Sequence, residues 1–318
     1  MLNFVYCFDK NYNFQALTSI NSLLENCEEE ISIYIIHNQP KTLNLDLIIH
    51  KEKANIHLLL IDTNKFEFPN LQNAHVSEAT YFRLYISKLL PTDLDFIIYI
   101  DSDIICIKDP TKNIRETIRS LKKSSLCIAA KTELIRDESI IESLDRFNAL
   151  EMENNRYFNA GVLIIDFQYW VNNNIEETLF QILRNYYKNI KFWDQDILNK
   201  FFDGRYVELK NSCNYEFGIY NKDKYEQQFL DEDIELVHFN GKGKPWNVQN
   251  IMFDSTEVYQ SAYRKLGIGY YHITFPRELR YLKIFLRYIF SLKFLNLPKP
   301  FNYLFESLKA LIRATLRL

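Results

Sequence analysis

Two aspartates stand directly after a short apolar run, at a spacing that suits metal binding. The run is FIIYI at residues 96–100, and Asp101-Ser102-Asp103 follows it. Carboxylates at i and i+2 leave a strand end on the same side, where they can bind a hard divalent cation such as Mg²⁺ or Mn²⁺. Such a cation binds the oxygens of a diphosphate and neutralises the negative charge that develops on the diphosphate as it leaves. The alternative is a solvated strand end, but two ionised carboxylates this close favour a shared cation.

A second cluster of chemically useful residues is the segment HFNGKGKPW at 238–246, which follows the apolar run IELV. The segment holds two of the seven glycines in the chain, and glycine lets the backbone approach a ligand closely. Lys244 supplies a point charge for phosphate. His238, at a strand end, offers a neutral ring nitrogen as a third metal ligand. The alternative is a β-turn with a core histidine and a packed tryptophan.

Short apolar runs rich in β-formers must position these side chains. Near-continuous runs of this kind are typical of strands buried on both faces of a parallel sheet. Longer segments between them, such as 13–26 and 78–90, carry apolar residues at helical spacing, and 174–202 is also expected to be helical. The alternation predicts a doubly wound α/β sheet, whose ligands bind beyond the carboxyl ends of the strands. The expected strands are residues 2–8, 31–37, 55–61, 95–100, 125–130 and 161–166.

The composition excludes several classes of protein. With 47% hydrophobic residues, seven glycines and eight prolines, the chain is neither disordered nor collagen-like. Five cysteines without a CxxC pair argue against a disulfide framework or a zinc knuckle and for a reducing compartment. Asp9 and Lys10 interrupt the first apolar run and no basic segment precedes it, so we expect no signal peptide. No run reaches the roughly 18 apolar residues that a transmembrane helix needs.

The net charge of −3 is divided unevenly. Residues 277–318 hold nine Lys and Arg against two Glu, a net charge of +7, whereas residues 1–276 hold 29 against 39, a net charge of −10. The basic tail suits an anionic partner, and the acidic body argues against nucleic acid. The change in composition near Pro276 sets the expected boundary between a main domain, 1–276, and a tail, 277–318.

Six short motifs follow one another between about residue 2 and residue 250. Their residues and their order resemble glycosyltransferase family 8. The resemblance implies a GT-A type fold, which is a single Rossmann-like nucleotide-binding domain with a mixed central sheet. It also implies retaining, metal-dependent transfer from a UDP-sugar, as in bacterial lipopolysaccharide and lipooligosaccharide α-galactosyl- and α-glucosyltransferases. The motifs are Asp9-Lys10-Asn11-Tyr12, Thr80-Tyr81-Phe82-Arg83-Leu84, Asp101-Ser102-Asp103, Tyr157-Phe158-Asn159-Ala160-Gly161-Val162, Asp194-Gln195-Asp196-Ile197-Leu198-Asn199 and HFNGKGKPW.

The resemblance assigns most of these motifs to the donor. It implies that Asp101, Asp103 and His238 bind Mn²⁺, with Mg²⁺ as the alternative. Without it, Asp9 and Asn11 are explained as helix caps. The other donor-binding positions that it implies are Cys7, Asp9, Asn11, Tyr12, Val76, Arg83, Ser102, Asn159, Ala160, Gln195, Gly241 and Lys244.

The motif Asp194-Gln195-Asp196 supplies the expected catalytic residues. Taken alone, the two acids are explained by capping and by favourable interaction with a helix N-terminus. By resemblance the segment lies under the donor sugar, with Gln195 on the face opposite the leaving UDP. A double displacement needs a carboxylate nucleophile there, and an amide is a poor one. We therefore expect same-side substitution, with Asp196 as the alternative nucleophile. Trp193 departs from common family forms and borders the sugar pocket.

Residues 301–318 form the clearest amphipathic helix of the chain. At 100° per residue, its apolar side chains fall within an arc of roughly 160°. Residues 277–297 add Arg277, Arg280, Lys283 and Arg287 among aromatic residues and leucines, and Lys293 breaks this pattern. We expect a helix pair that lies on an anionic membrane surface without spanning it. The alternative is a helix that docks on the catalytic domain or on a second subunit. The residues of the arc are Phe301, Leu304, Phe305, Leu308, Leu311, Ile312, Leu316 and Leu318.

These features together predict a hexosyltransferase at the cytoplasmic face of a bacterial membrane. It would move galactose or glucose from a UDP-sugar to a hydroxyl of a lipid-anchored oligosaccharide. The polar segments 132–157 and 211–232 are expected to shape the acceptor side of the site. The alternatives are a transferase acting on a glycoprotein or cell-wall polymer and a non-catalytic carbohydrate- or membrane-binding module. A nucleotidyltransferase is disfavoured because residues 8–14 contain no glycine. The choice of donor sugar, acceptor and linkage stays open.

Overall fold

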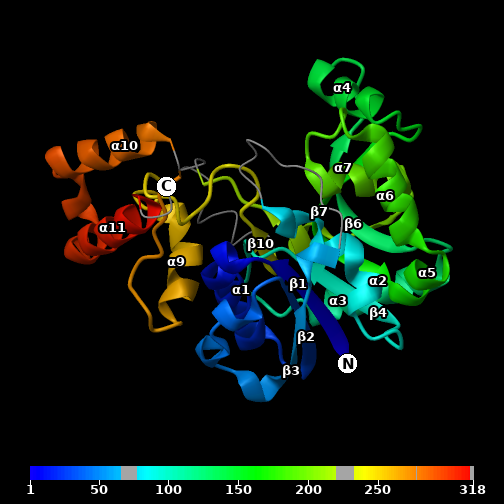
Figure 1. The fold of residues 1–318 in the computed structure, drawn as a ribbon, viewed down its shortest axis with the longest axis horizontal. Helices are drawn as coiled ribbons and strands as arrows, with labels where there is room; N and C mark the ends of the chain where they lie inside the picture. Colours follow the sequence, from blue (N-terminus) through cyan, green and yellow to red (C-terminus); the bar gives the residue numbers. More distant parts are fainter. Residues whose placement is uncertain (66–76, 220–232, 277, 316–318) are drawn as a thin grey trace.

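The computed structural model describes residues 1–65, 77–219, 233–276 and 278–315, and its centre is a seven-stranded sheet (Figure 1). A separate three-stranded sheet, in the order β5-β10-β9, begins where β4 ends. The strands are β1 (Leu2–Phe8), β2 (Ile31–His37), β3 (Ala54–Leu60), β4 (Phe96–Ile100), β5 (Ile104–Cys106), β6 (Ile128–Ile135), β7 (Arg156–Asp166), β8 (Val207–Glu208), β9 (Tyr215–Glu216) and β10 (Leu236–His238).

The central sheet has the strand order β3-β2-β1-β4-β7-β6-β8. The first four strands are parallel, as their apolar runs predict. β7 runs antiparallel to both β4 and β6. The predicted α/β fold with a mixed central sheet is therefore confirmed, and the carboxyl ends of β1 and β4 lie side by side.

Helices cover both faces of this sheet, because the side chains of each strand alternate between the faces. On β1, Phe4, Tyr6 and Phe8 pack against the helices α1, α3 and α9, while Val5 and Cys7 pack against η6, α6 and α7. The helices are α1 (Asn13–Asn26), the 3₁₀ helix η6 (Glu78–Tyr85), α2 (Ile86–Leu89), α3 (Thr111–Lys123), α4 (Ile141–Ala149), α5 (Phe167–Asn172), α6 (Ile175–Tyr186), α7 (Trp193–Phe202), α9 (Glu257–Arg264), α10 (Leu279–Phe290), the 3₁₀ helix η9 (Lys293–Asn296) and α11 (Pro300–Thr315).

Two strands differ from the sequence predictions. β3 is not buried on both faces but alternates between half-buried and exposed residues, because it forms the edge of the sheet. β7 begins at Arg156 rather than near Gly161, so the segment Phe158–Gly161 lies within a strand and not in a loop. Register shifts between β6 and β7 accompany this longer pairing. Irregular strand pairing next to an active site commonly changes the direction in which side chains point.

The segment 78–90 is not one α-helix but the 3₁₀ helix η6 followed by the short α2. A 3₁₀ helix has three residues per turn, so residues i and i+3 lie on one face. Thr80 and Arg83 consequently point to the same partner, the Asp194 carboxylate. The α-helical prediction missed this geometry because the apolar spacing of so short a segment fits either helix.

The segment 174–202 is likewise two helices, α6 and α7, instead of one. The chain turns between them because the Asp196 carboxylate accepts hydrogen bonds from the backbone N–H groups of Lys191 (2.6 Å) and Phe192 (2.8 Å). Trp193 then adopts a φ of +47°, a left-handed conformation that strains a bulky side chain. The turn brings the first residues of α7 to the carboxyl end of the sheet.

The C-terminal helices α10 and α11 pack against the main domain through one apolar cluster (Figure 1). Tyr281, Phe285 and Tyr303 of the tail share this cluster with Val248 and Ile273 of the main domain. The Glu306 carboxylate also accepts hydrogen bonds from the backbone N–H groups of residues 270 and 271. The tail therefore has no separate core. In the described part of the chain, no helix is long and apolar enough to cross a bilayer.

Candidate active site

A cavity of about 590 Å³ opens at the carboxyl ends of β1 and β4, where the sheet is expected to bind a ligand. Two predicted site residues, Asn11 and Asp196, do not line it, and Val76 lies outside the described residues. The predicted residues that do line it are Cys7, Asp9, Tyr12, Arg83, Asp101, Ser102, Asp103, Asn159, Ala160, Asp194, Gln195, His238, Gly241 and Lys244.

Asp101, Asp103 and His238 offer one ligand atom each, all within 4.8 Å of one another. They meet because β10 pairs antiparallel with β5, which places His238 opposite Ile104, the residue after Asp103. Asp103 Oδ1 is buried without a hydrogen-bond donor among the described residues and lies 3.4 Å from His238 Nε2. An unsatisfied carboxylate oxygen beside an imidazole suits a divalent cation such as Mn²⁺. These residues are therefore a candidate metal site.

The histidine is held in the tautomer that a metal ligand needs. His238 Nδ1 lies 2.9 Å from Asn214 Oδ1, and the Asn214 amide nitrogen donates to Asn159 Oδ1 at 3.0 Å. Asn159 Oδ1 also accepts from the backbone N–H of Gly161. Because Asn214 must therefore offer its oxygen to His238, the ring proton sits on Nδ1 and the lone pair of Nε2 faces Asp103. Hydrogen bonds of this kind orient metal ligands and tune their affinity.

Gly161 makes room for the histidine ring. A Cβ added at Gly161 would lie 2.2 Å from His238 Cε1 and 2.7 Å from His238 Nδ1, closer than any real contact. The absence of a side chain at Gly161 thus admits the imidazole of His238.

Lys244 lies on the other oxygen of Asp103. Its ammonium contacts Asp103 Oδ2 and donates to the backbone oxygen of Phe239 at 2.8 Å. Burial raises the pKa of Asp103, but the Lys244 ammonium outweighs this effect and holds the pKa below its ordinary value. Asp103 is therefore a carboxylate at neutral pH, ready to bind a cation.

Arg83 is surrounded by acceptors on the floor of the cavity. Its guanidinium donates to Asp101 Oδ1 at 2.8 Å and to the backbone oxygen of Ala160, and it lies 4.0 Å above the Tyr99 ring. The Tyr99 hydroxyl donates to the same Asp101 oxygen at 2.6 Å. Asp101 Oδ1 thus accepts from two protein donors, which fix the orientation of this carboxylate. Arg83 therefore orients a candidate metal ligand as well as lining the cavity.

Asp194 is the second carboxylate that Arg83 holds. Arg83 Nε lies 2.7 Å from Asp194 Oδ2, and the Thr80 hydroxyl donates to Oδ1 at 2.7 Å. Burial raises the pKa of Asp194 to about 6, although Arg83 and Thr80 act in the opposite direction. The guanidinium therefore links the metal-site acid Asp101 to Asp194, an acid at the start of α7.

Gln195 has a fixed orientation in the cavity wall. Its oxygen accepts from the backbone N–H of Ala160 at 2.9 Å, and its amide nitrogen donates to Glu133 Oε2 at 2.9 Å. Burial and the nearby Glu216 raise the pKa of Glu133. The side-chain amide of Gln195 and the carboxylate of Glu133 thus face the cavity together.

Asp196, in contrast, is sealed beneath the site. It is fully buried and accepts from the Tyr157 hydroxyl (2.7 Å), from Arg146 (3.0 Å) and from the two backbone N–H groups that end the turn before α7. Its oxygens are occupied by these four donors, and it does not line the cavity. Asp196 supports the loop on which Asp194 and Gln195 stand.

The opposite end of the cavity, after β1, holds the predicted nucleotide-binding residues. Asp9 caps the 3₁₀ turn η1 (Lys10–Tyr12) by accepting from the backbone N–H and the amide of Asn11. The capping explanation for Asp9 therefore holds, and the residue lines the cavity as well. Tyr12 stands edge-on to Trp246, with 6.2 Å between ring centroids. Gly241 lies between His238 and Lys244 in the chain. Its φ of +67° is in the left-handed region that favours glycine.

A sequence profile of Glycosyl transferase family 8 matches residues 3–250, which is most of the chain. The chain belongs to glycosyl transferase family 8. Its general activity is therefore glycosyl transfer.

Curated proteins and solved structures are similar to the chain over most of its length. The chain is 29% identical over 263 residues to General stress protein A of Bacillus subtilis (strain 168), covering 78% of this chain and 88% of the relative. It is 27% identical over 270 residues to the lipopolysaccharide 1,2-glucosyltransferase of Escherichia coli (strain K12), covering 82% and 77%. The structure resembles that of the galactosyltransferase LgtC in complex with donor and acceptor sugar analogues, with a TM-score of 0.67, 20% identity and coverage of 88% and 99%.

The sequence did not point to four residues of this family 8 site. Tyr99 could have been found, since it lies two residues before Asp101 on the same face of β4. Thr80 lies in a quoted motif but received no role. Glu133 and Asn214 come from polar segments without a periodic pattern, and only the fold brings Glu133 to the cavity and Asn214 to His238.

Proposed function

We propose that this chain is a retaining, metal-dependent hexosyltransferase that uses a UDP-sugar. It would transfer galactose or glucose to a hydroxyl of a lipid-anchored oligosaccharide. The observation that carries this proposal is the group Asp101, Asp103 and His238 on the floor of the cavity, with Lys244 beside it. Two carboxylates, an imidazole and an ammonium in one cavity suit a diphosphate and its cation.

The metal residues and Lys244 would bind the diphosphate end of the donor. Asp101, Asp103 and His238 would hold Mn²⁺ or Mg²⁺, which neutralises the negative charge of the leaving UDP when it is bound. Lys244 would add a point charge for the phosphate oxygens. Gly241, with its positive φ and open surroundings, would let the backbone follow the diphosphate.

The residues after β1 would bind the uridine. Asp9 can accept a hydrogen bond from the uracil N–H, and the ring of Tyr12 offers a face on which the base can stack. Both residues line the cavity, as does Cys7 at the end of β1. Asn11 would act through Asp9, to which its backbone N–H and its amide donate.

The start of α7 would hold the donor sugar during transfer. Asp194 can accept hydrogen bonds from sugar hydroxyls, and the fixed amide of Gln195 would face the anomeric carbon. Because Asp196 is buried with its oxygens occupied, the observations favour same-side substitution over a double displacement through that residue. In this mechanism the acceptor hydroxyl attacks from the side that UDP leaves, and a phosphate oxygen of the leaving group takes its proton.

The outward face of the tail supports a membrane-bound acceptor. Phe301, Phe305, Leu308 and Ile312 recur along one side of α11, and each exposes between 46% and 74% of its surface. Phe290 at the end of α10 is 82% exposed. Basic residues of both helices flank this stripe. We infer that it inserts into the headgroup region of an anionic membrane at the cytoplasmic face.

The first experiment measures donor binding by calorimetry across a panel of UDP-sugars, with Mn²⁺ and again with a chelator. One sugar should bind in a metal-dependent way and be hydrolysed slowly. Asp103→Ala should abolish both, while Asp46→Ala, which changes an exposed acid far from the cavity, should leave them unchanged. Binding of no nucleotide sugar to folded protein would refute the proposal.

Product analysis tests the stereochemistry. An α-linked donor should yield an α-linked product, and a β-linked product would contradict retention.

A further inference from the structure

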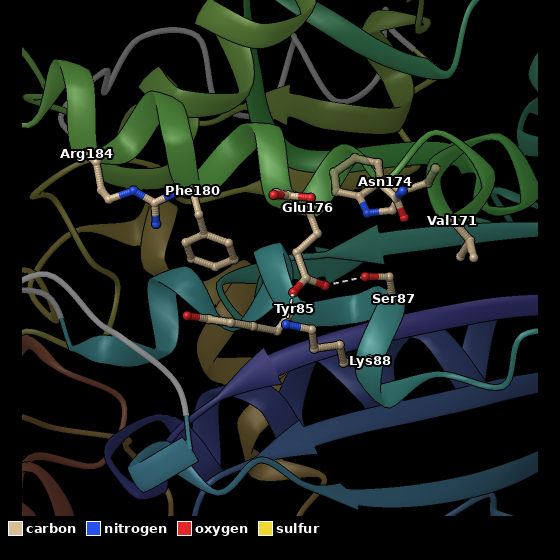
Figure 2. Close-up of a pocket in the computed structure, with 10 residues that line it drawn as sticks. Tyr85, Ser87, Lys88, Val171, Asn174, Glu176, Phe180 and Arg184 are labelled. Carbon is tan, nitrogen blue, oxygen red and sulfur yellow. Dashed lines mark hydrogen bonds and ion pairs between the residues drawn. The ribbon is translucent and has the colours of Figure 1, made fainter.

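A second cavity, of about 580 Å³, lies away from the reaction site, between α2 and the helices α5 and α6 (Figure 2). Among the described residues, none lines both cavities. The two are joined by one run of chain, because η6 carries Thr80 and Arg83 to the active site and ends at Tyr85 beside this second cavity.

One wall of the second cavity carries a hydrogen-bond donor without a partner. Trp170 is 1% exposed and lines the cavity, and its indole N–H has no acceptor in the part of the chain that the structure describes. An unsatisfied buried donor costs on the order of 1–3 kcal/mol.

A buried carboxylate is held in place on the other side. The side chain of Glu176 is 8% exposed, pairs with the Lys88 ammonium at 2.7 Å and accepts from the Ser87 hydroxyl. Figure 2 shows both partners reaching Glu176 from α2 across the cavity. The contacts fix the orientation of the carboxylate, and most of the Lys88 side chain stays exposed to donate to a ligand.

Aromatic faces and a guanidinium complete the lining. The rings of Tyr85 and Phe180 pack 4.4 Å apart at 37°. Arg184, one turn further along α6, is exposed at the cavity and has no ion pair within the described ranges. Lys88 and Arg184 balance Glu176 and Glu177, so the lining is close to neutral and does not favour a strongly charged ligand.

We propose that this second cavity is a binding site for a neutral saccharide. Sugar hydroxyls both donate and accept, which matches the fixed carboxylate of Glu176, the exposed ammonium of Lys88 and the guanidinium of Arg184, and the apolar face of a pyranose ring suits an aromatic wall. The site would hold a sugar unit outside the reaction centre, and its place beside η6 puts it in contact with the element that carries Arg83.

The test uses the indole N–H resonances of the full-length protein, which has three tryptophans. Trp170→Phe assigns the Trp170 signal. With the active site saturated by UDP and Mn²⁺, methyl α-galactoside, methyl α-glucoside and lactose are titrated in turn, followed by inorganic phosphate. At least one saccharide should shift the Trp170 signal saturably, and phosphate should not.

Two exposed residues of this region give matched variants. Arg184→Gln should weaken saccharide binding about tenfold, the loss expected for a hydrogen bond to a charged group. Lys188→Gln, which does not line the cavity, should change it less than twofold. A Trp170 signal that no saccharide moves, or that phosphate moves instead, would overturn the proposal.

This outcome is independent of the proposed transferase activity. Asp103→Ala should abolish donor binding while the Trp170 titration stays the same, so that the two proposals can fail separately.

Discussion

At the scale of single residues, the metal site depends on contacts between parts of the chain that are far apart in sequence. The aspartates of the site and His238 could be predicted, because each follows an apolar run. The tautomer of His238 could not, since it depends on Asn214, and neither could the occupation of Asp101 Oδ1 by Arg83 and Tyr99. Residue type and spacing therefore predicted which side chains form the candidate metal site, whereas their orientation required the fold.

The first prediction concerns the space that Gly161 leaves for His238. In Gly161→Ala the new methyl group displaces the imidazole, so the affinity for Mn²⁺ should fall about 10- to 100-fold, as when the support of a metal ligand is removed. Titration calorimetry with Mn²⁺ measures this effect. Gly218→Ala is the control, because a Cβ there meets nothing within 4 Å. Equal affinities of the two variants would contradict the role given to Gly161.

The second prediction concerns Asp194. Burial raises its folded-state pKa to about 6, above the ordinary value of 3.8, so the native state binds the extra proton between these values. Its contribution to the unfolding free energy is therefore complete below pH 3.8 and is lost as the pH rises through about 6. A shift of about two pKa units corresponds to roughly 3 kcal/mol.

Asp194→Asn removes this titration. In metal-free protein, the unfolding free energy of the wild type relative to the variant should fall by that amount from acidic to neutral pH, as measured by urea unfolding. Asp46→Asn, at an exposed position, should follow the wild type. Parallel pH profiles for wild type and Asp194→Asn would show that the buried acid does not titrate in this range.

At the scale of elements, the sequence predicted which segments are regular better than where they end. The strand over residues 2–8 was predicted with its observed bounds because its apolar run is bounded by charge, but the early start of β7 depends on pairing with β6. The break between α6 and α7 depends on Asp196, whose capping contacts come from residues before it. The pairing of β6 with β7 is a tertiary contact, which a local pattern does not contain.

The third prediction concerns the contact that fastens α11 to the main domain. Glu306→Ala removes the acceptor of the backbone N–H groups of Tyr270 and Tyr271, which should lower the unfolding free energy by about 1–3 kcal/mol. Hydrogen exchange at these two amides should accelerate. Glu278→Ala, which removes an exposed acid paired with Arg280, serves as the control. Unchanged exchange would mean that the apolar cluster alone holds the helix.

At the scale of the whole molecule, one face of the tail packs on the main domain, while another face remains exposed to solvent. The sequence predicted an amphipathic helix that lies on a membrane surface, with docking on the main domain or on a second subunit as the alternative. α11 docks through Tyr303, Glu306 and Ser307, which lie off its most apolar side, and so turns the stripe of Phe301 and Phe305 outward. The direction in which the helix faces could not be read from its own periodicity, because it is set by the pocket that receives Tyr303.

The fourth prediction follows from this outward stripe. Deleting residues 277–318 would uncover the apolar cluster around Val248 and Ile273, so substitution is the sharper test. Phe290→Ser, Phe301→Ser and Phe305→Ser together should reduce binding to phosphatidylglycerol vesicles more than tenfold, because each buried phenylalanine contributes about 1.5–3 kcal/mol. Donor binding should be unchanged.

Vesicle flotation measures this binding, with neutral phosphatidylcholine vesicles for comparison. The control combines Ile49→Ser and Leu60→Ser. Both change exposed apolar residues outside the tail, and Leu60 is the last residue of β3. If the triple variant binds like the wild type, the stripe does not contact the membrane.

If Asp103 binds the cation and Lys244 the diphosphate, as we propose, the ammonium of Lys244 on Asp103 links the binding of these two ligands thermodynamically. A cation that binds Asp103 must compete with this ammonium, and a diphosphate that attracts Lys244 removes the competitor. Each ligand should therefore strengthen the binding of the other by the same factor, since such coupling is reciprocal. At low concentrations of the cation and of the donor, the fraction of enzyme with both ligands bound would follow the product of the two concentrations. A fall in either concentration would therefore lower this fraction more steeply than it would if the two sites were independent.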